Sequence, residues 1–185
     1  MTSEELLDLK FPIGKFIMPD DFPLELKKNW IRVISEFPDA LLNEVSAISK
    51  EQKKSKYRPD GWSLTQVVHH CADSHMNAFI RFKLALTEEN PTIRPYLEDE
   101  WGELSDSNDR DLMPSVNLLI GLHERWALLL ENMSGDEFER GYFHPETNAI
   151  VSLKEALGTY AWHSEHHLKH VKMALEANGK YNAKF

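Results

Sequence analysis

The sequence predicts an all-α protein in which four helices form a bundle. Four long segments carry apolar residues that recur every three or four positions, which is the spacing of one face of an α-helix. Polar stretches that contain proline or glycine separate these segments, and the chain carries no strong strand signal. Its 185 residues are enough for one sizeable core, so we expect a single domain over residues 1–185. Helices of this kind bury their apolar stripes by packing into a four-helix bundle.

The first 23 residues are rich in proline and mixed in character. We expect an irregular N-terminal arm over residues 1–23 that packs on the body through its apolar side chains, Phe11, Ile13 and Phe16. A first helix should follow over residues 24–48, where apolar residues recur at the helical spacing. Pro38 lies inside this segment. Because proline has no N–H and clashes with the preceding turn, we expect a kink or a break before it.

The second and third helices have clear start signals. A polar stretch ends in a Pro-Asp-Gly turn, and a capping box of Ser63 and Gln66 then starts a helix that reaches about residue 86. Residues 87–113 form a long connector, and a connector of this length is usually functional or crosses between distant elements. The third helix should run over residues 114–131, beginning with a proline, which is favoured in the first turn.

The fourth helix contains four of the nine histidines in the chain. Before it, residues 134–150 look like a loop or a short irregular hairpin. Ser152 and Glu155 then form a second capping box. The helix that they start runs over residues 153–177 and ends at a C-cap signal, Asn178-Gly179.

Composition and charge exclude several classes of protein. The net charge is −9 and no Lys/Arg cluster supplies the basic face of a duplex-binding domain, so we expect no nucleic-acid partner. No apolar run approaches the roughly 18 residues of a membrane span, and the acidic N-terminus does not resemble a signal peptide. The single cysteine, Cys71, rules out an internal disulfide framework. It fits a reducing compartment, so we expect a cytoplasmic protein without a membrane partner.

Two histidines of the fourth helix, His163 and His167, lie one turn apart on the same helical face. This is the spacing with which a helix presents two imidazoles to one metal ion. Both border the apolar stripe, whereas His166 faces nearly away from it, towards solvent. A third ligand has to come from another helix, and the candidates on the second helix are His69, His70 and His75. His70 is the best placed of them, because it lies on the inward edge of that helix.

Three neutral imidazoles without a thiolate suit Zn²⁺, with Ni²⁺, Co²⁺ or Fe²⁺ as alternatives. A structural zinc site fills four positions with protein groups, so three ligands leave an open position for water, hydroxide or a substrate thiolate. The alternative is that the histidine pair is half-buried polar surface and binds no metal. We interpret Cys71 as core packing and His123 as a hydrogen-bonded histidine at the core edge. The remaining histidines are expected either on the surface or beside the metal ligands, as groups that contact a ligand but not the ion: His75, His144, His166 and His170.

Several sequence motifs occur along the chain. They are FPIG at 11–14, YRPDGWS at 57–63, QVVHH at 66–70, ADSHMN at 72–77, IRFKL at 80–84, TEE at 87–89, IRPY at 93–96, FHP at 143–145, and WHS at 162–164 followed by His167. Together they resemble the YfiT group of the DinB superfamily, and the similarity covers nearly the whole chain. The departure that we notice is Cys71, where an aliphatic residue is expected after QVVHH.

The resemblance implies a DinB-like four-helix bundle that holds one divalent metal on three histidines. By matching positions these are His70, His163 and His167, the set that spacing and helix face also favour. The resemblance further implies a cytoplasmic homodimer with metal-dependent hydrolase activity that binds zinc or nickel. Other members of the superfamily are transferases that use low-molecular-weight thiols, notably bacillithiol and mycothiol.

Three functions fit these residues. In the first, the protein is an enzyme, a metal-dependent hydrolase whose open metal position activates water for attack on a small-molecule substrate. In the second, a low-molecular-weight thiol is deprotonated at this position and attacks an electrophile, which makes the protein an S-transferase. In the third, the metal binds a ligand or ties two helices together without turnover. A role on damaged DNA would rest on the superfamily's name alone, and the acidic charge opposes it.

Further site residues are expected on the second helix and on the long connector. Asp73 lies one turn beyond His70 and is a candidate for orienting a ligand or relaying a proton. The alternative is that Asp73 is a solvated charge on the helix surface. If the connector folds over the metal, the substrate pocket contains Ser74, Arg81, Arg94, Tyr96, Glu98 and Trp101.

Overall fold

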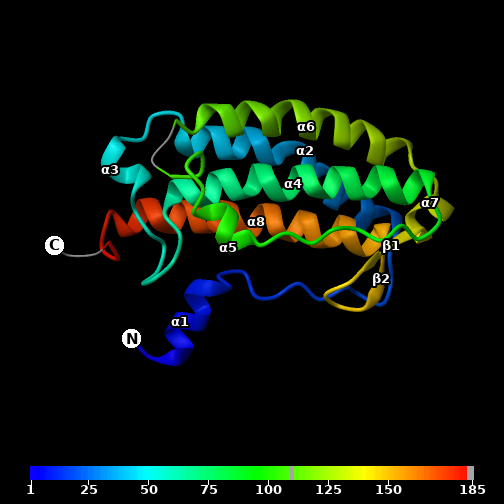
Figure 1. Cartoon of the computed structure of the whole chain (residues 1–185), viewed down its shortest axis with the longest axis horizontal. Coiled ribbons are helices and arrows are strands. Elements are labelled where there is room, and N and C mark those ends of the chain that lie inside the picture. The colour runs from blue at the N-terminus through cyan, green and yellow to red at the C-terminus, as the bar shows by residue number, and fades with distance from the viewer. Residues whose placement is uncertain (109–110, 183–185) are drawn as a thin grey trace.

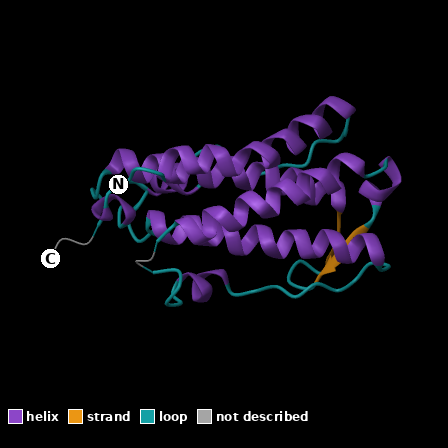
Figure 2. Ribbon diagram, turned by 90° about the horizontal axis from the view of Figure 1, so that it is seen from above, coloured by secondary structure: helices purple, strands orange, loops and turns teal. Residues whose placement is uncertain are grey.

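The computed structural model describes residues 1–108 and 111–182 and confirms the four-helix bundle (Figure 1, Figure 2). Its long helices are α2 (Leu24–Val45), α4 (Leu64–Thr87), α6 (Met113–Asn132) and α8 (Leu153–Ala177). Helices α2 and α4 each pack against both α6 and α8, so the apolar faces of all four meet inside the bundle. Within the described residues, every helix is too short or too polar to serve as a membrane span.

Three of the four long helices begin and end within two residues of the predicted positions. At the start of α4 the predicted capping box is present. The Ser63 hydroxyl accepts a hydrogen bond from the backbone N–H of Gln66 (3.2 Å), and the Gln66 side chain accepts one from the backbone N–H of Ser63 (3.0 Å). Helix α8 ends at Asn178, which takes the left-handed conformation of a C-cap (φ 44°). Local sequence signals therefore predict where these helices begin and end.

Of the kink or break expected before Pro38, the break is wrong, because α2 is continuous from Leu24 to Val45. Pro38 has no N–H, so the carbonyl of Ile34, four residues earlier, lacks its usual partner within the helix. That carbonyl instead accepts a hydrogen bond from Nδ1 of His123 on α6 (2.6 Å). A donor from the neighbouring helix thus replaces the bond that the proline removes, and Pro38 itself is buried against the bundle.

The structure contains short helices that the sequence did not predict. They are α1 (Ser3–Lys10), α3 (Lys50–Lys53), α5 (Glu98–Gly102) and α7 (Gly135–Glu139). Helices α1, α3 and α7 each begin with a complete capping box. Segments of this length are too short to show the repeated apolar spacing that identifies a long helix.

The N-terminal arm is therefore helical in its first part, which corrects the expectation of an irregular arm over residues 1–23. After α1, residues 11–23 run along the outside of α8 (Figure 1). The indole Nε1 of Trp162 on α8 donates a hydrogen bond to the carbonyl of Gly14 (3.0 Å). The Phe16 ring lies 6.2 Å from that of Trp30 on α2. The arm is thus attached to two helices of the bundle.

Two of the three apolar side chains expected to anchor the arm do so. Phe11 and Phe16 are half-buried, as predicted. Ile13 is 41 % exposed, so its predicted packing is wrong. It lies in a turn closed by a hydrogen bond from the N–H of Gly14 to the carbonyl of Phe11 (2.9 Å), which holds it away from the bundle.

The long connector begins beside a small hairpin at the end of α4 and then passes along the bundle, through α5, to the start of α6 (Figure 1). The strands β1 (Gly141–His144) and β2 (Ala149–Ser152) pair antiparallel. Of the loop or hairpin expected over residues 134–150, the hairpin is thus present, but it extends to Ser152 and follows the helix α7. The connector is joined to β1 by two backbone hydrogen bonds: Ile93 N–H to Phe143 O (3.1 Å) and Phe143 N–H to Pro91 O (2.9 Å).

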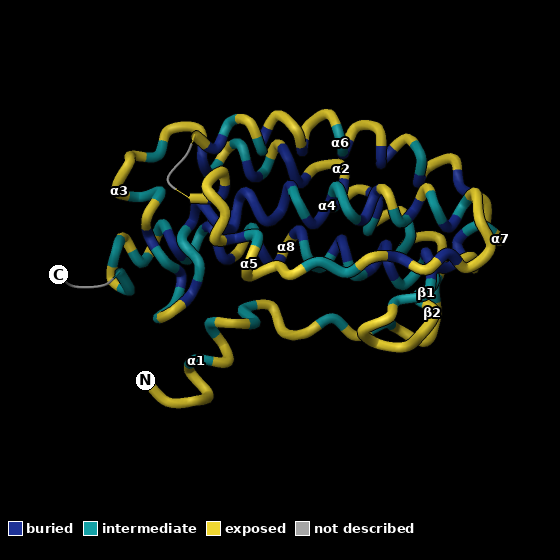
Figure 3. The backbone as a smooth tube through the Cα atoms, viewed as in Figure 1, coloured by how far each residue is buried: buried dark blue, intermediate teal, exposed yellow. Residues whose placement is uncertain are grey.

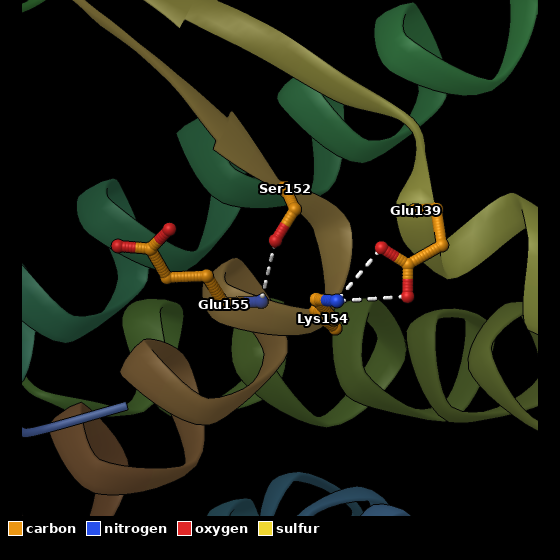
Figure 4. A network of polar contacts seen from close by, with 4 residues as sticks. All are labelled: Glu139, Ser152, Lys154 and Glu155. Carbon is orange, nitrogen blue, oxygen red and sulfur yellow. Dashed lines mark hydrogen bonds and ion pairs between the residues drawn. The ribbon is translucent and has the colours of Figure 1, made fainter. Parts of the chain in front are cut away.

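The hairpin leads directly into α8 (Figure 4). The hydroxyl of Ser152 accepts a hydrogen bond from the N–H of Glu155 (3.2 Å), as an N-cap does. The Glu155 carboxylate points away from Ser152, so the second half of the predicted capping box is absent. Ser152 belongs to the strand ladder, opposite Gly141. An ion pair between Lys154 and Glu139 (2.7 Å) adds a contact from α7 to the first turn of α8.

Two buried apolar clusters fill the bundle, and the inward sides of the long helices are buried along their length (Figure 3). The first cluster includes Phe82, Trp126 and Leu157, and the second includes Leu41, Leu64 and Leu119. His75, which is fully buried, contacts both clusters: its ring lies 5.3 Å from Phe37 and 6.1 Å from Trp126. A histidine side chain therefore lies where the two clusters meet.

The contact between α8, α2 and the arm depends on Gly158. A Cβ at this position would lie 2.7 Å from Trp30 and 2.8 Å from Phe16, closer than real Cβ atoms approach ring carbons. Gly158→Ala is therefore expected to destabilise the protein by about 1–3 kcal/mol, because overpacking outweighs the gain of up to about 1 kcal/mol in helix propensity. Thermal unfolding followed by circular dichroism measures the effect.

The matched control is Gly121→Ala on α6, where a Cβ would have no neighbour within 4 Å. This change is expected to raise stability by up to about 1 kcal/mol, since it removes the helix penalty of glycine without a clash. If both variants were stabilised alike, the close approach of Trp30 and Phe16 to α8 would be contradicted.

Candidate metal centre

Helices α4 and α8 bring three histidines together. His163 and His167 lie one turn apart on α8, and His70 faces them from α4. One ring nitrogen from each of the three lies within 4.8 Å of the others. The Nε2 atoms of His70 and His163 are 3.3 Å apart. We call His70, His163 and His167 the candidate triad.

The other two candidates on the second helix point elsewhere. His69 precedes His70 by one position, which turns its side chain by about 100° around the helix. Its Nδ1 lies 2.7 Å from the hydroxyl of Ser115 on α6. His75 lies deeper in the bundle, and its Nε2 contacts Nδ1 of His163 (2.9 Å) rather than the point where the candidate triad converges. Of the three, the structure therefore places His70 with His163 and His167.

The candidate triad fits a tetrahedral divalent ion. Two imidazole nitrogens held about 2.0–2.1 Å from one zinc ion lie about 3.3 Å from each other. The two Nε2 atoms of His70 and His163 already have that separation, 3.3 Å. Burial lowers the pKa of His70 to about 4, with a smaller effect from His166, and it holds the pKa values of His163 and His167 well below the usual range. All three rings are therefore neutral at pH 7, the form that binds metal.

A cavity of about 510 Å³ opens at the candidate triad. Among the described residues, no further His, Cys, Asp or Glu joins the triad within the same 4.8 Å, so protein atoms leave coordination positions free. Aromatic and charged side chains share the cavity wall: Phe11, Trp62, Trp162, Lys10, Arg58, Asp60, Glu98 and Asp99. Space for a substrate therefore adjoins the three imidazoles.

A second set of histidines on α8 lines the same cavity. Ring nitrogens of His166, His167 and His170 also lie within 4.8 Å of one another, and we call these residues the α8 cluster. The prediction that His166 faces solvent is wrong, since it is only 6 % exposed. Its ring stacks on Trp162 (4.4 Å) and lies 6.0 Å from Phe11 of the arm. The arm covers a face of α8 that a helix considered alone presents to water.

The predicted pocket residues fall into different places. Glu98 lines the cavity of the candidate triad. Arg94, Tyr96 and Trp101 line a neighbouring cavity of about 550 Å³ together with Asn77. The other two line neither cavity: Ser74 is buried on α4, and Arg81 donates a hydrogen bond to the carbonyl of Arg94 (3.3 Å). Of the four side chains expected from the connector, one therefore lines the cavity of the candidate triad, and the other three line the second cavity.

Asp73 does not line either cavity. Its carboxylate is half-buried, and partial burial followed by repulsion from Asp106 raises its pKa to about 6. Glu98, at the edge of the candidate triad's cavity, also has a raised pKa, mainly through lost hydration and then through the charge of Asp99. Cys71 is fully buried, which raises the pKa of its thiol, so it packs in the core as predicted.

Several cavity residues were not singled out from the sequence. Tyr57, Arg58, Asp60 and Trp62 come from the segment that leads into α4, and Lys10 and Phe11 come from the arm. The first four lie within the YRPDGWS motif, so the motif was a usable signal. Phe11 belongs to the FPIG motif of the arm, whereas Lys10 lies outside every motif named above.

This chain is similar to several known proteins. A sequence model described as "DinB superfamily" matches residues 33–171. The chain is 47 % identical over 171 residues to the "Putative metal-dependent hydrolase YfiT" of Bacillus subtilis, and the match covers 92 % of this chain and 94 % of that protein. A relative from Oceanobacillus iheyensis, named in the same terms, is 46 % identical over 162 residues, which is 88 % of this chain and 93 % of the relative.

A solved structure is also similar. Its title reads "YfiT from Bacillus subtilis is a probable metal-dependent hydrolase with an unusual four-helix bundle topology". The TM-score is 0.88 at 46 % sequence identity, and the match covers 91 % of this chain and 97 % of that one. The bundle described above therefore has the topology of a solved protein.

Proposed function

The chain belongs to the DinB superfamily, and on this premise we propose that it is a hydrolase with one zinc ion on His70, His163 and His167. The observation that carries the proposal is the convergence of three neutral imidazoles from two helices at the wall of a cavity. Imidazole ligands suit zinc, and nickel is the alternative that the same ligands accept. The names of the relatives support dependence on a metal.

A divalent ion in such a site supplies Lewis acidity, which activates water for hydrolysis. We assign the remaining roles to side chains of the cavity wall. Lost hydration raises the pKa of Glu98, which makes its carboxylate a stronger base than an exposed glutamate, and it takes the role of proton acceptor in place of Asp73. Trp62 and Trp162 offer apolar surface to a substrate and keep bulk water from it.

Transfer of a low-molecular-weight thiol is our second candidate. The cavity wall carries both cationic side chains, Lys10 and Arg58, and acidic ones, Asp60, Glu98 and Asp99. A wall with charges of both signs suits a small cosubstrate that itself carries both charges. Such a thiol would occupy the position that water takes in hydrolysis.

The test compares metal-loaded protein with chelator-treated protein. Each form is assayed with a panel of activated esters and amides, and separately with a thiol plus an alkyl halide. Metal-dependent release of acid from the esters or amides is the expected result. Turnover that requires both thiol and halide would support the second candidate, and tight metal binding without turnover would support a binding module.

Two variants control the assay. The double variant His70→Ala, His163→Ala removes two ligands of the candidate triad and is expected to lose turnover. His144→Ala changes a histidine of β1 that lies outside the cavity and is expected to keep it. Unchanged turnover in the double variant would remove the metal from the mechanism.

A further inference from the structure

The carbonyl freed by Pro38 fixes the proton position on a buried histidine. The Ile34 carbonyl lacks its usual N–H partner four residues later in α2, and Nδ1 of His123 lies 2.6 Å from it. A carbonyl oxygen only accepts hydrogen bonds, so Nδ1 of His123 has to carry the hydrogen. A neutral imidazole has one N–H, which leaves Nε2 of His123 as an acceptor.

The tautomer of His123 determines the tautomers of His75 and His163 in turn. Nε2 of His123 faces Nδ1 of His75 at 2.8 Å, so Nδ1 of His75 donates and its Nε2 accepts. Nε2 of His75 faces Nδ1 of His163 at 2.9 Å, so Nδ1 of His163 donates in turn. The lone pair of His163 is then on Nε2, the atom that lies 3.3 Å from Nε2 of His70.

The surroundings favour neutral rings in this chain of hydrogen bonds. His75 is 0 % exposed and His123 is 1 % exposed. Their neighbours are the aromatic rings of Phe37 and Trp126, which cannot replace the hydration of an imidazolium. This series of hydrogen bonds joins all four long helices, from Ile34 on α2 through α6 and α4 to His163 on α8.

We propose that His123 and His75 are positioning residues that hold His163 in the tautomer with its Nε2 lone pair facing the metal. Their effect on the metal rests on the proposed function, because it takes His163 as a ligand. Partners that hold the second nitrogen of a metal-ligating histidine fix its tautomer and its ring orientation. Here Pro38 determines which ring nitrogens donate in this series of hydrogen bonds, since it leaves the Ile34 carbonyl free to accept a hydrogen bond from His123.

The first measurement needs no variant and no metal. Long-range ¹H–¹⁵N NMR spectra of the labelled metal-free protein distinguish ring nitrogens that carry hydrogen from those with a lone pair. His123, His75 and His163 are each expected to carry hydrogen on Nδ1. Hydrogen on Nε2 of His163 would overturn the inference, whether or not the protein binds a metal.

The second measurement compares zinc affinities by competition with a chromophoric chelator. His75→Leu removes the acceptor of the His163 hydrogen and is expected to weaken zinc binding about 10–100-fold. His75→Gln places an amide oxygen near the same point and is expected to restore most of the affinity. The control is His69→Leu, a change at a buried histidine of the same helix that is bonded to Ser115, and it should leave zinc affinity unchanged.

The outcomes separate this inference from the proposed function. A purely structural role would lower the stability of both His75 variants without moving the hydrogen on His163. Equal zinc affinity of His75→Leu and His69→Leu would overturn the inference. A wild-type protein that carries hydrogen on Nδ1 of His163 and binds no divalent ion would contradict the proposed function and support the chain of tautomers.

Discussion

His70→Ala is expected to lower zinc affinity by more than about 100-fold and to abolish metal-dependent turnover. Loss of a group that only supports a ligand costs about 10–100-fold, and removing one of three ligands exceeds that cost. His70 is also the ligand from α4 that joins the two on α8, so its loss removes the link between the helices. Metal content after dialysis and competition with a chromophoric chelator measure the change.

The matched control is His166→Ala. His166 belongs to the α8 cluster, which shares His167 with the candidate triad. Neighbouring positions on a helix point about 100° apart, so the rings of His166 and His167 approach a common ion less favourably than rings from two facing helices. His166→Ala is expected to change zinc affinity by less than about 10-fold. The reverse order of effects would place the ion on the α8 cluster.

The metal-free protein is expected to lose stability steeply as the pH falls below about 6.5. Burial is the main cause that lowers the pKa values of all nine histidines, to about 4 for His70, His123 and His166 and to about 3 for His170. Between about pH 6.5 and these values the unfolded chain binds protons that the folded chain does not. The free energy of unfolding therefore falls with falling pH and is fully recovered above about pH 6.5.

The expected loss is large. Each proton bound only by the unfolded chain changes the free energy of unfolding by about 1.4 kcal/mol per pH unit. Asp73 and Glu98 act in the opposite direction, because their raised pKa values let the folded chain bind protons more readily. Two carboxylates do not offset nine histidines, so we expect a loss above about 3 kcal/mol between pH 7 and pH 5, out of a typical total of about 5–15 kcal/mol.

Urea unfolding at a series of pH values measures this loss. Zinc is the control, since ligands bound to the ion cannot take up protons. At 100 times its dissociation constant, zinc adds about 2.7 kcal/mol to the stability, so it should move acid unfolding to lower pH. A metal-free protein that is equally stable at pH 7 and pH 5 would contradict the neutral, buried state of these rings.

The long helices could be predicted from the sequence because their signals are local. Helix α8 has a start at Ser152, a repeated apolar stripe and an end at Asn178, and all three lie within one segment. The pair His163 and His167 follows from helical spacing alone. His70 required more, because its place opposite them depends on α4 packing against α8. The inward edge of α4 and the family resemblance both indicated it.

The features that were missed depend on contacts between distant segments. The continuity of α2 through Pro38 needs His123 from α6, which no local pattern reveals. The burial of His166 needs Phe11, which comes from the arm. The connector carries Tyr96 and Trp101 to a separate cavity, and its path depends on its pairing with β1 rather than on its own composition. The sequence of a single helix or loop does not contain the information that determines such contacts.

The arm has a consequence for how proteins of this fold can diversify. Lys10 and Phe11 contribute to the cavity wall, while the three imidazoles stand on α4 and α8. On the proposed function, part of the cavity wall is thus encoded in a stretch of the chain that carries none of the three ligands. On the same proposal, changes in Lys10 or Phe11 are expected to alter which substrates the cavity accepts without removing a ligand of the ion.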